Sequence, residues 1–235
     1  MKQSASSNRL LSLDILRGIA IAGMILVNNP GSWRYIYQPL RHADWHGLTP
    51  TDLAFPFFMF IMGISTFLSL RKYNFQASKV SVWKIVKRTF VIFLIGLILN
   101  WFGQLSWHLG TGQSFLNAAT HFESFRFAGV LQRLALAYGF AAMFSLFFNS
   151  KQLIGIIGSL LIGYFLILFF GNGFEKSEQN IISIVDKAIW GTARIYKDGG
   201  IALDAEGILN TLPCIAHVLI GFLFGKMIVE TKADH

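Results

Sequence analysis

The sequence has little charge and almost no cysteine. Only 14% of its 235 residues are Asp, Glu, Lys or Arg, whereas a soluble domain usually carries about a quarter. With 54% hydrophobic residues and a mean hydropathy of +0.53, it has too few polar side chains to cover a water-soluble globule. Its single cysteine, Cys214, excludes an intramolecular disulfide framework. These shortages exclude an ordinary soluble or disulfide-stabilised domain and indicate a membrane protein.

The charges that are present lie in the connections between apolar runs. A formal net charge of +8 can indicate nucleic-acid binding, but a charge distribution confined to loops is typical of membrane topology. Segment 71–88 holds six Lys or Arg and no acid, whereas segment 104–125 holds no Lys or Arg. The excess of basic residues in cytoplasmic loops places 71–88 and both termini inside. We therefore expect a lipid bilayer and no nucleic acid as partner, with outer loops 30–52, 104–125 and 172–206.

The apolar runs predict an all-α fold, a polytopic membrane helix bundle with about six transmembrane helices and both termini cytoplasmic. A span needs about 20 mostly apolar residues. Backbone groups in lipid must pair within the segment, and runs such as 90–99 lack the alternation of a membrane barrel. Residues 181–190 are predicted to form an amphipathic helix in the membrane interface. The predicted spans are 10–29, 53–70, 88–103, 127–148, 152–171 and 208–226.

Several ionisable residues fall within or next to these spans, where charge is costly. Asp14 and Arg17 share a helix face and can pair, either as an interfacial ion pair or as a cytoplasmic-side site for a charged cofactor. Arg126 is interpreted as a headgroup anchor. Arg133 lies at least one helical turn inside the apolar run and needs a buried partner. That partner is either an acid in a structural ion pair or a substrate. His217 is interpreted as a hydrogen-bonded core histidine.

The first outer loop gathers aromatic and ionisable residues. His42 and His46 flank Asp44 and Trp45. Their spacing invites a zinc interpretation, but the loop has no helical pattern and no third ligand nearby, so no metal is expected.

The end of the same loop carries a helix-start signal. Thr49 suits the cap of the next helix, Pro50 its first position and Asp52 its third. A carboxylate there also favours the helix dipole. We therefore predict a mainly structural role for Asp52. Within the last apolar run, the pair Gly221 and Gly225 is interpreted as a helix-packing contact.

Five stretches carry a resemblance to a known family. In chain order they read RLLSLDILRG (9–18), MILVNNPG (24–31), RHADWHGLTPTDLAFPFFMFIMG (41–63), GVLQRLALAY (129–138) and DAEGILNTLPCIAHVLIGFLFGK (204–226). Together they resemble the heparan-α-glucosaminide N-acetyltransferase family and its bacterial relatives. The resemblance covers nearly the whole chain and implies a single transmembrane acyltransferase domain over 1–235. Family members continue with further helices, so it also implies that this is the N-terminal portion of such a domain.

The resemblance implies an enzyme that moves acetyl from cytosolic acetyl-CoA to an amino sugar across the membrane. The family's catalytic histidine matches His42, and its asparagine at the outer end of the first core helix matches Asn28. The spacing between the two is a few residues longer here than in the animal enzyme. His46 also stands where the animal sequence has an asparagine. These two departures bear on the identity of the acceptor more than on the chemistry.

The implied mechanism gives each candidate residue a role. His42 is either the general base that deprotonates the attacking amine or a nucleophile that is itself acetylated. The amide of Asn28 would stabilise the negative oxygen of the tetrahedral intermediate. Acetyl-CoA would bind with its phosphates near Arg17 and Asp14, roughly 16 Å of helix from Asn28. Asp44 or Asp52 would orient the imidazole, and Trp45 and Arg133 are candidate acceptor contacts.

Three further expectations concern the whole protein. Alternative functions are O-acylation of a cell-surface polysaccharide, or transport or binding without catalysis. We expect an integral protein of the bacterial cytoplasmic (inner) membrane whose catalytic loop faces outward. A homo-oligomer is a possible assembly.

Overall fold

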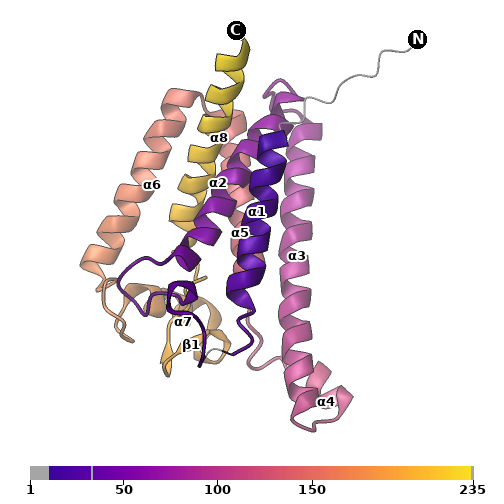
Figure 1. Cartoon of the computed structure of the whole chain (residues 1–235), viewed down its shortest axis with the longest axis vertical. Helices are drawn as coiled ribbons and strands as arrows, with labels where there is room; N and C mark the ends of the chain where they lie inside the picture. The colour runs from indigo at the N-terminus through magenta and orange to yellow at the C-terminus, as the bar shows by residue number, and fades with distance from the viewer. Residues whose placement is uncertain (1–10, 33, 234–235) are drawn as a thin grey trace.

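The computed structural model describes residues 11–32 and 34–233 and is almost entirely helical. Within this part of the chain, six helices of 18 residues or more run side by side as one bundle (Figure 1). They are α1 (Leu11–Asn28), α2 (Pro50–Arg71), α3 (Lys79–Gly110), α5 (Val130–Phe147), α6 (Ser150–Phe170) and α8 (Thr211–Ala233). The short elements are η1 (Gln38–Leu40), α4 (Phe115–Ala119), α7 (Ile181–Trp190), η2 (Thr192–Arg194) and the antiparallel pair β1 (Lys197–Asp198) and β2 (Ile201–Ala202).

Five of the long helices are long and apolar enough to cross a membrane, namely α1, α2, α5, α6 and α8. The sixth, α3, does not meet the same criteria but traverses the same height, because it joins the upper end of α2 to the lower end of α5 (Figure 1). The chain therefore forms the predicted all-α membrane bundle. Its six long helices match the six predicted segments.

The ends of α3 differ from the prediction. Segment 71–88 was assigned to a loop, but its second half forms the first turns of α3. Ser78 caps this helix, since its Oγ accepts a bond from the backbone N–H of Ser81 at 3.1 Å and the Oγ of Ser81 accepts one from the N–H of Ser78 at 3.0 Å. This reciprocal capping stabilises a helix start within a basic segment, so charge alone misplaced the boundary. α3 also continues past the predicted end at 103 to Gly110.

The core lies where α2, α5 and α8 meet, around Met59, Ala137 and Val218. The backbones of α2 and α8 are in direct contact there. A Cβ added to Gly63 would lie 2.1 Å from the carbonyl oxygen of Val218, and one added to Gly221 would lie 2.1 Å from that of Phe60. The structure thus confirms that Gly221 serves close helix packing.

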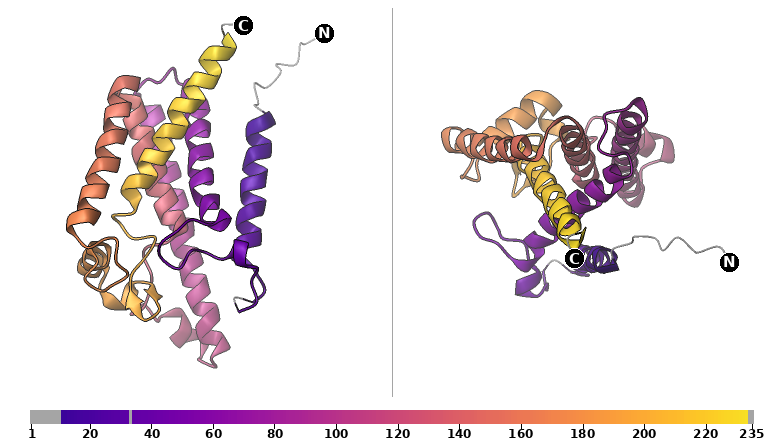
Figure 2. Two further views of the ribbon diagram at one scale, coloured as in Figure 1. Left: turned by 60° about the vertical axis from the view of Figure 1, so that its left-hand side comes forward. Right: turned by 90° about the horizontal axis from the view of Figure 1, so that it is seen from above.

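α1 and α6 lie at the edges of the bundle (Figure 2). α1 packs mainly on α2, through Leu13 and Ala20, and leaves Ile15 and Ile19 more than half exposed. Such outward apolar side chains suit lipid contact. The start of α1 and the end of α8 lie at one end of the bundle, and the long loops lie at the other (Figure 1).

Candidate active site

A cavity of about 680 Å³ opens among α1, α2, α5, α6, α8 and the long loops, at the end of the bundle where α1 stops and α2 starts. Five of the eight predicted site residues line this one cavity although they come from three separate parts of the chain. They are Asn28, His42, Trp45, Asp52 and Arg133.

His42 and Asp52 form a pair on the cavity wall. The Nδ1 atom of His42 lies 2.6 Å from Oδ1 of Asp52. The other oxygen of Asp52, Oδ2, accepts bonds from the backbone N–H and the hydroxyl of Thr49, both at 2.9 Å, and from the N–H of Ala43 at 3.2 Å. A carboxylate held by so many donors stays in place and can accept from Nδ1–H. In the neutral tautomer with the hydrogen on Nδ1, the Nε2 atom of His42 carries the lone pair.

Asp52 thus contacts both the start of α2 and the imidazole of His42. The cap at the start of α2 is present as predicted, with Thr49 as its partner. The contact with His42 places Asp52 where it can orient the imidazole, and that role stays a prediction. Asp44, the other candidate for orienting the imidazole, is exposed and is not among the residues lining the cavity.

Asn28 occupies the last turn of α1 with a fixed amide. Its Nδ2 donates one hydrogen bond to the carbonyl oxygen of Met24 at 2.8 Å. An amide nitrogen carries two hydrogens, so one donor remains for a ligand. The bond to Met24 fixes the direction of the amide and leaves a donor in the same cavity as His42.

Trp45 attaches the loop between α1 and α2 to the connection between α6 and α7. Its Nε1–H donates to the carbonyl oxygen of Phe174 at 2.6 Å. Phe174 itself lies between α6 and α7 and also lines the cavity. The bond therefore closes one side of the cavity with two segments far apart in sequence.

Asp14 and Arg17 lie away from this cavity, towards the other end of α1. Nη1 of Arg17 is 3.3 Å from Oδ1 of Asp14, and Nη2 donates to the hydroxyl of Ser65 on α2 at 2.5 Å. The predicted ion pair is thus present, and it also joins α1 to α2. A role in holding a cofactor stays a prediction.

Arg126 is not a headgroup anchor, as the sequence had suggested, but the centre of an ion-pair network between the segments that precede α5 and α8. Its Nε and Nη2 atoms donate to the two oxygens of Asp204 at 2.9 and 2.5 Å, and Nη2 also contacts Glu206. Asp204 is only 1% exposed. Burial alone lowers the pKa of Arg126, but the bond to Asp204 and the charges of Asp204 and Glu206 outweigh it and raise that pKa.

The loop before α8 and α8 itself add polar residues that the sequence did not single out. The hydroxyl of Tyr164 donates to Oδ1 of Asn210 at 2.6 Å, and both line the cavity. His217, predicted to be a core histidine, is exposed to the cavity, with Nδ1 3.3 Å from the carbonyl oxygen of Pro213. Asn210, Pro213, Cys214 and His217 follow the spacing i, i+3, i+4 and i+7, so a helical-face count would have grouped them.

The described residues contain no group of three or more His, Cys, Asp or Glu side chains that could hold a metal ion. The cavity instead combines an imidazole with a free lone pair, a fixed amide donor and a guanidinium. This set can move a proton, stabilise an oxyanion and bind an acidic group.

Comparison with known proteins connects this arrangement to a chemistry. The family model described as heparan-alpha-glucosaminide N-acetyltransferase, catalytic, matches residues 9–235. The heparan-alpha-glucosaminide N-acetyltransferase of Homo sapiens is 29% identical, with the match covering 98% of this chain and 40% of that protein. The Mus musculus protein of the same description is 39% identical over 97% of this chain and 40% of its own length. The chain thus spans about two fifths of the length of these curated relatives.

Proposed function

The chain belongs to the heparan-alpha-glucosaminide N-acetyltransferase family, and from this premise we propose that it is a membrane acetyltransferase acting on an amino sugar. Acetyl-CoA is the proposed donor and the sugar amino group the acceptor. The observation that carries the proposal is the His42–Asp52 pair, 2.6 Å apart, on the wall of a cavity that also holds the amide of Asn28.

The proposed reaction is the attack of an amine on a thioester. The amine lone pair forms a C–N bond with the thioester carbonyl carbon, and the C–S bond then breaks. Nε2 of His42 takes the proton from the amine, and that proton finally neutralises the departing thiolate. Asp52 accepts from Nδ1–H throughout and stabilises the transient imidazolium. The second amide hydrogen of Asn28 donates to the oxyanion.

The same geometry suits a two-step route through an acetylated histidine. Nε2 of His42 would attack the thioester carbonyl and release CoA, and the amine would then attack the acetyl-imidazole. Intact mass measurement of the protein mixed with acetyl-CoA alone separates the routes. A gain of one acetyl group, absent in His42→Ala, supports the two-step route, whereas an unchanged mass supports direct transfer.

The proposed topology places the donor and acceptor on opposite sides. The basic segment 71–88 and the start of α1 share one end of the bundle, where CoA phosphates would meet positive charge. The His42 cavity lies near the other end. We propose that this end faces outward from the cytoplasmic membrane of a bacterium, with Arg17 and Asp14 on the donor side.

The test is acetyl transfer from radiolabelled acetyl-CoA to glucosamine by the purified protein in detergent. We expect transfer by the wild type and a loss of roughly a hundredfold or more in His42→Ala. His121→Ala is the matched control, because it removes an imidazole that does not line the cavity, and it should retain activity. Full activity in His42→Ala would overturn the mechanism. Transfer to a sugar hydroxyl but not to an amine would favour O-acylation.

A further inference from the structure

Two arginines lie close to the cavity, and only one of them has acidic partners. Arg126 is paired with Asp204 and Glu206. Arg133, seven residues further along the chain, lines the cavity itself. Within the described ranges Arg133 forms no ion pair, and its Nη1 donates to the main-chain carbonyl oxygen of Ala205 at 2.6 Å. The predicted buried acid is therefore not its partner.

Arg133 has donors to spare. A guanidinium presents five N–H groups in a planar fork, and the Nε of Arg133 is buried without a hydrogen-bond partner in the described structure. A buried donor left unsatisfied is costly unless a ligand completes it. The carboxylates on the same wall already have their own donors, since Asp52 holds His42 and Thr49 and Glu206 holds Arg126.

The guanidinium is also held in a fixed orientation. Its carbon lies 4.1 Å from the centroid of the Phe55 ring, a close cation–π contact. Phe55 follows Asp52 by three residues on α2, so both lie on the same helix face. The first turns of α2 therefore position the partner of His42 and the support of Arg133 together. A fixed, planar donor fork matches a carboxylate or phosphate rather than a neutral hydroxyl.

We propose that Arg133 is the anion-binding residue of this cavity and holds a carboxylate or phosphate group of a substrate beside His42. The anion belongs to an acidic acceptor sugar, because the proposed topology places the phosphates of the donor at the other end of the bundle. This inference rests on the proposed function, because it assigns the anion to a substrate of the acetyl transfer.

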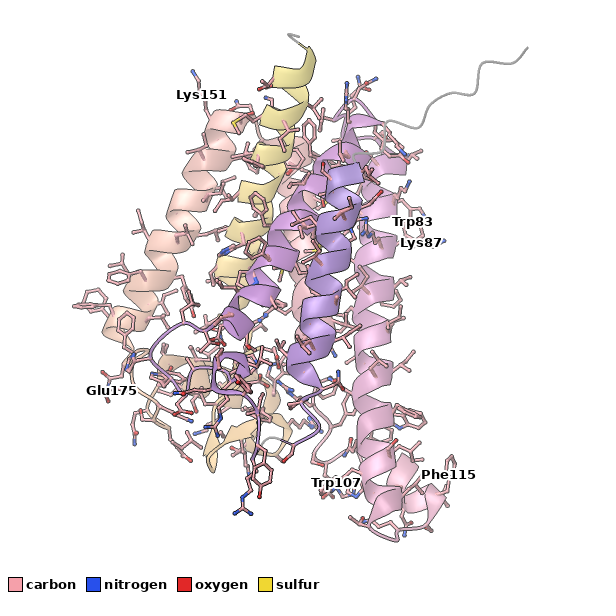
Figure 3. All side chains as sticks on the ribbon, viewed as in Figure 1. Trp83, Lys87, Trp107, Phe115, Lys151 and Glu175 are labelled. Atoms are coloured by element: carbon pink, nitrogen blue, oxygen red, sulfur yellow. The ribbon has the colours of Figure 1, made fainter. Side chains whose placement is uncertain are left out.

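The test measures binding without turnover, so that a chain inactive in acetyl transfer still gives an answer. The affinities of two pairs of ligands are measured in detergent, and each pair differs by one phosphate group. The first pair is glucosamine and glucosamine 6-phosphate, and the second is pantetheine and 4′-phosphopantetheine. The variants are Arg133→Gln, which removes the charge, and Arg133→Lys, which keeps the charge but removes the fork. Lys151→Gln is the control, because it removes one positive charge at the opposite end of the bundle (Figure 3).

We expect the wild type and Lys151→Gln to bind one phosphorylated ligand roughly tenfold to a hundredfold more tightly than its neutral match. Arg133→Gln should erase that preference, and Arg133→Lys should reduce it severalfold. Loss of the sugar preference in Arg133→Gln supports an anion on the acceptor, whereas loss of the pantetheine preference alone would place the anion on the donor and overturn that assignment. The proposal is overturned if the wild type has neither preference. It is also overturned if Arg133→Gln, melting like the wild type, keeps its preference in full.

Discussion

Asp52 connects the first turn of α2 to the imidazole of His42, so its substitution should affect both catalysis and the helix start. In Asp52→Asn the neutral amide still occupies the site, but it no longer stabilises a proton on Nδ1 or the imidazolium that forms during transfer. We expect the acetyl-transfer rate to fall by roughly a hundredfold. The weakened cap should also reduce the free energy of unfolding by about 1 kcal/mol or less. This loss would appear as a slightly lower melting temperature.

Two variants separate these effects. Thr49→Ala removes one cap bond and leaves the 2.6 Å contact between His42 and Asp52 in place. It should lower the melting temperature but retain most of the activity. Asp44→Asn, in the same loop but exposed, should change neither. A Thr49→Ala variant as inactive as Asp52→Asn would show that the cap, rather than the imidazole contact, sets the rate.

The sequence predicted single residues well where the relevant signal is local. The Thr49–Asp52 cap spans four consecutive positions of a helix start, so its residue types alone identify it. The contact of Asp52 with His42 crosses a loop without periodicity, and no spacing rule specifies it. Arg126 was misassigned because its partner Asp204 lies 78 residues away in another outer loop. His42 itself was found through the family resemblance.

At the scale of elements, the crossing of α2 and α8 depends on the absence of a side chain at Gly221. A Cβ there would lie 2.1 Å from the carbonyl oxygen of Phe60, so the helices must separate to admit it. We expect Gly221→Ala to destabilise the protein by about 1–3 kcal/mol, seen as a lower melting temperature in detergent. Gly155→Ala on α6 meets nothing within 4 Å and should melt like the wild type or higher. Equal melting of both variants would contradict this packing.

α7 contains a buried acid that makes stability depend on pH. Asp186 is 1% exposed, its Oδ1 accepts from the N–H of Ile208 at 3.0 Å, and its Oδ2 has no partner in the described structure. Burial, helped by the charge of Asp204 and opposed by the Ile208 bond, raises the pKa of Asp186 to about 6. The folded protein therefore holds this proton more tightly than the unfolded chain, whose carboxyl has a pKa of about 3.9.

Because the pKa of Asp186 is higher in the folded than in the unfolded protein, the free energy of unfolding falls as the pH rises. The contribution of Asp186 is complete below about pH 4, where its carboxyl is protonated in both the folded and the unfolded protein. It is lost as the pH rises to about 6. The loss is about 3 kcal/mol, from 1.36 kcal/mol for each unit of pKa difference. Melting curves between pH 4 and 8 should show it, and Asp186→Asn should flatten the curve over that window. If the melting temperature of the variant depends on pH as that of the wild type does, the pH dependence comes from other titratable groups.

The sequence predicts most of the long helices, because apolar runs of sufficient length identify membrane helices directly. The bounds of α7 match the predicted segment 181–190. The start of α3 was missed, since its first turns carry Lys79, Lys84, Lys87 and Arg88 and look like a charged loop. The cap at Ser78 and the packing of Ile85 and Val82 in the core stabilise these turns.

At the scale of the whole molecule, the basic segment 71–88 and the candidate site lie at opposite ends of the bundle. Lys87 and Lys151 lie toward the end where α1 begins, whereas Glu175, Trp107 and Phe115 lie at the other end (Figure 3). The positive-inside rule assigns the Lys-rich end to the cytoplasm. The loop that carries His42 is then on the outer side, so acetyl would have to be delivered from a cytosolic donor through the bundle. The orientation of the chain therefore decides whether this is a transmembrane transfer.

Cysteine labelling tests this orientation, because the chain has a single cysteine of its own. In a Cys214→Ser background, Gln113→Cys places a thiol on the exposed connection between α3 and α4, and Ala77→Cys places one on the exposed turn before α3. In right-side-out membrane vesicles, a membrane-impermeant maleimide should label Gln113→Cys and spare Ala77→Cys until the vesicles are opened. The reverse pattern would put His42 on the cytoplasmic side with the CoA pool. Acetyl transfer would then need no passage across the bilayer, and the donor role proposed for Arg17 would fail with it.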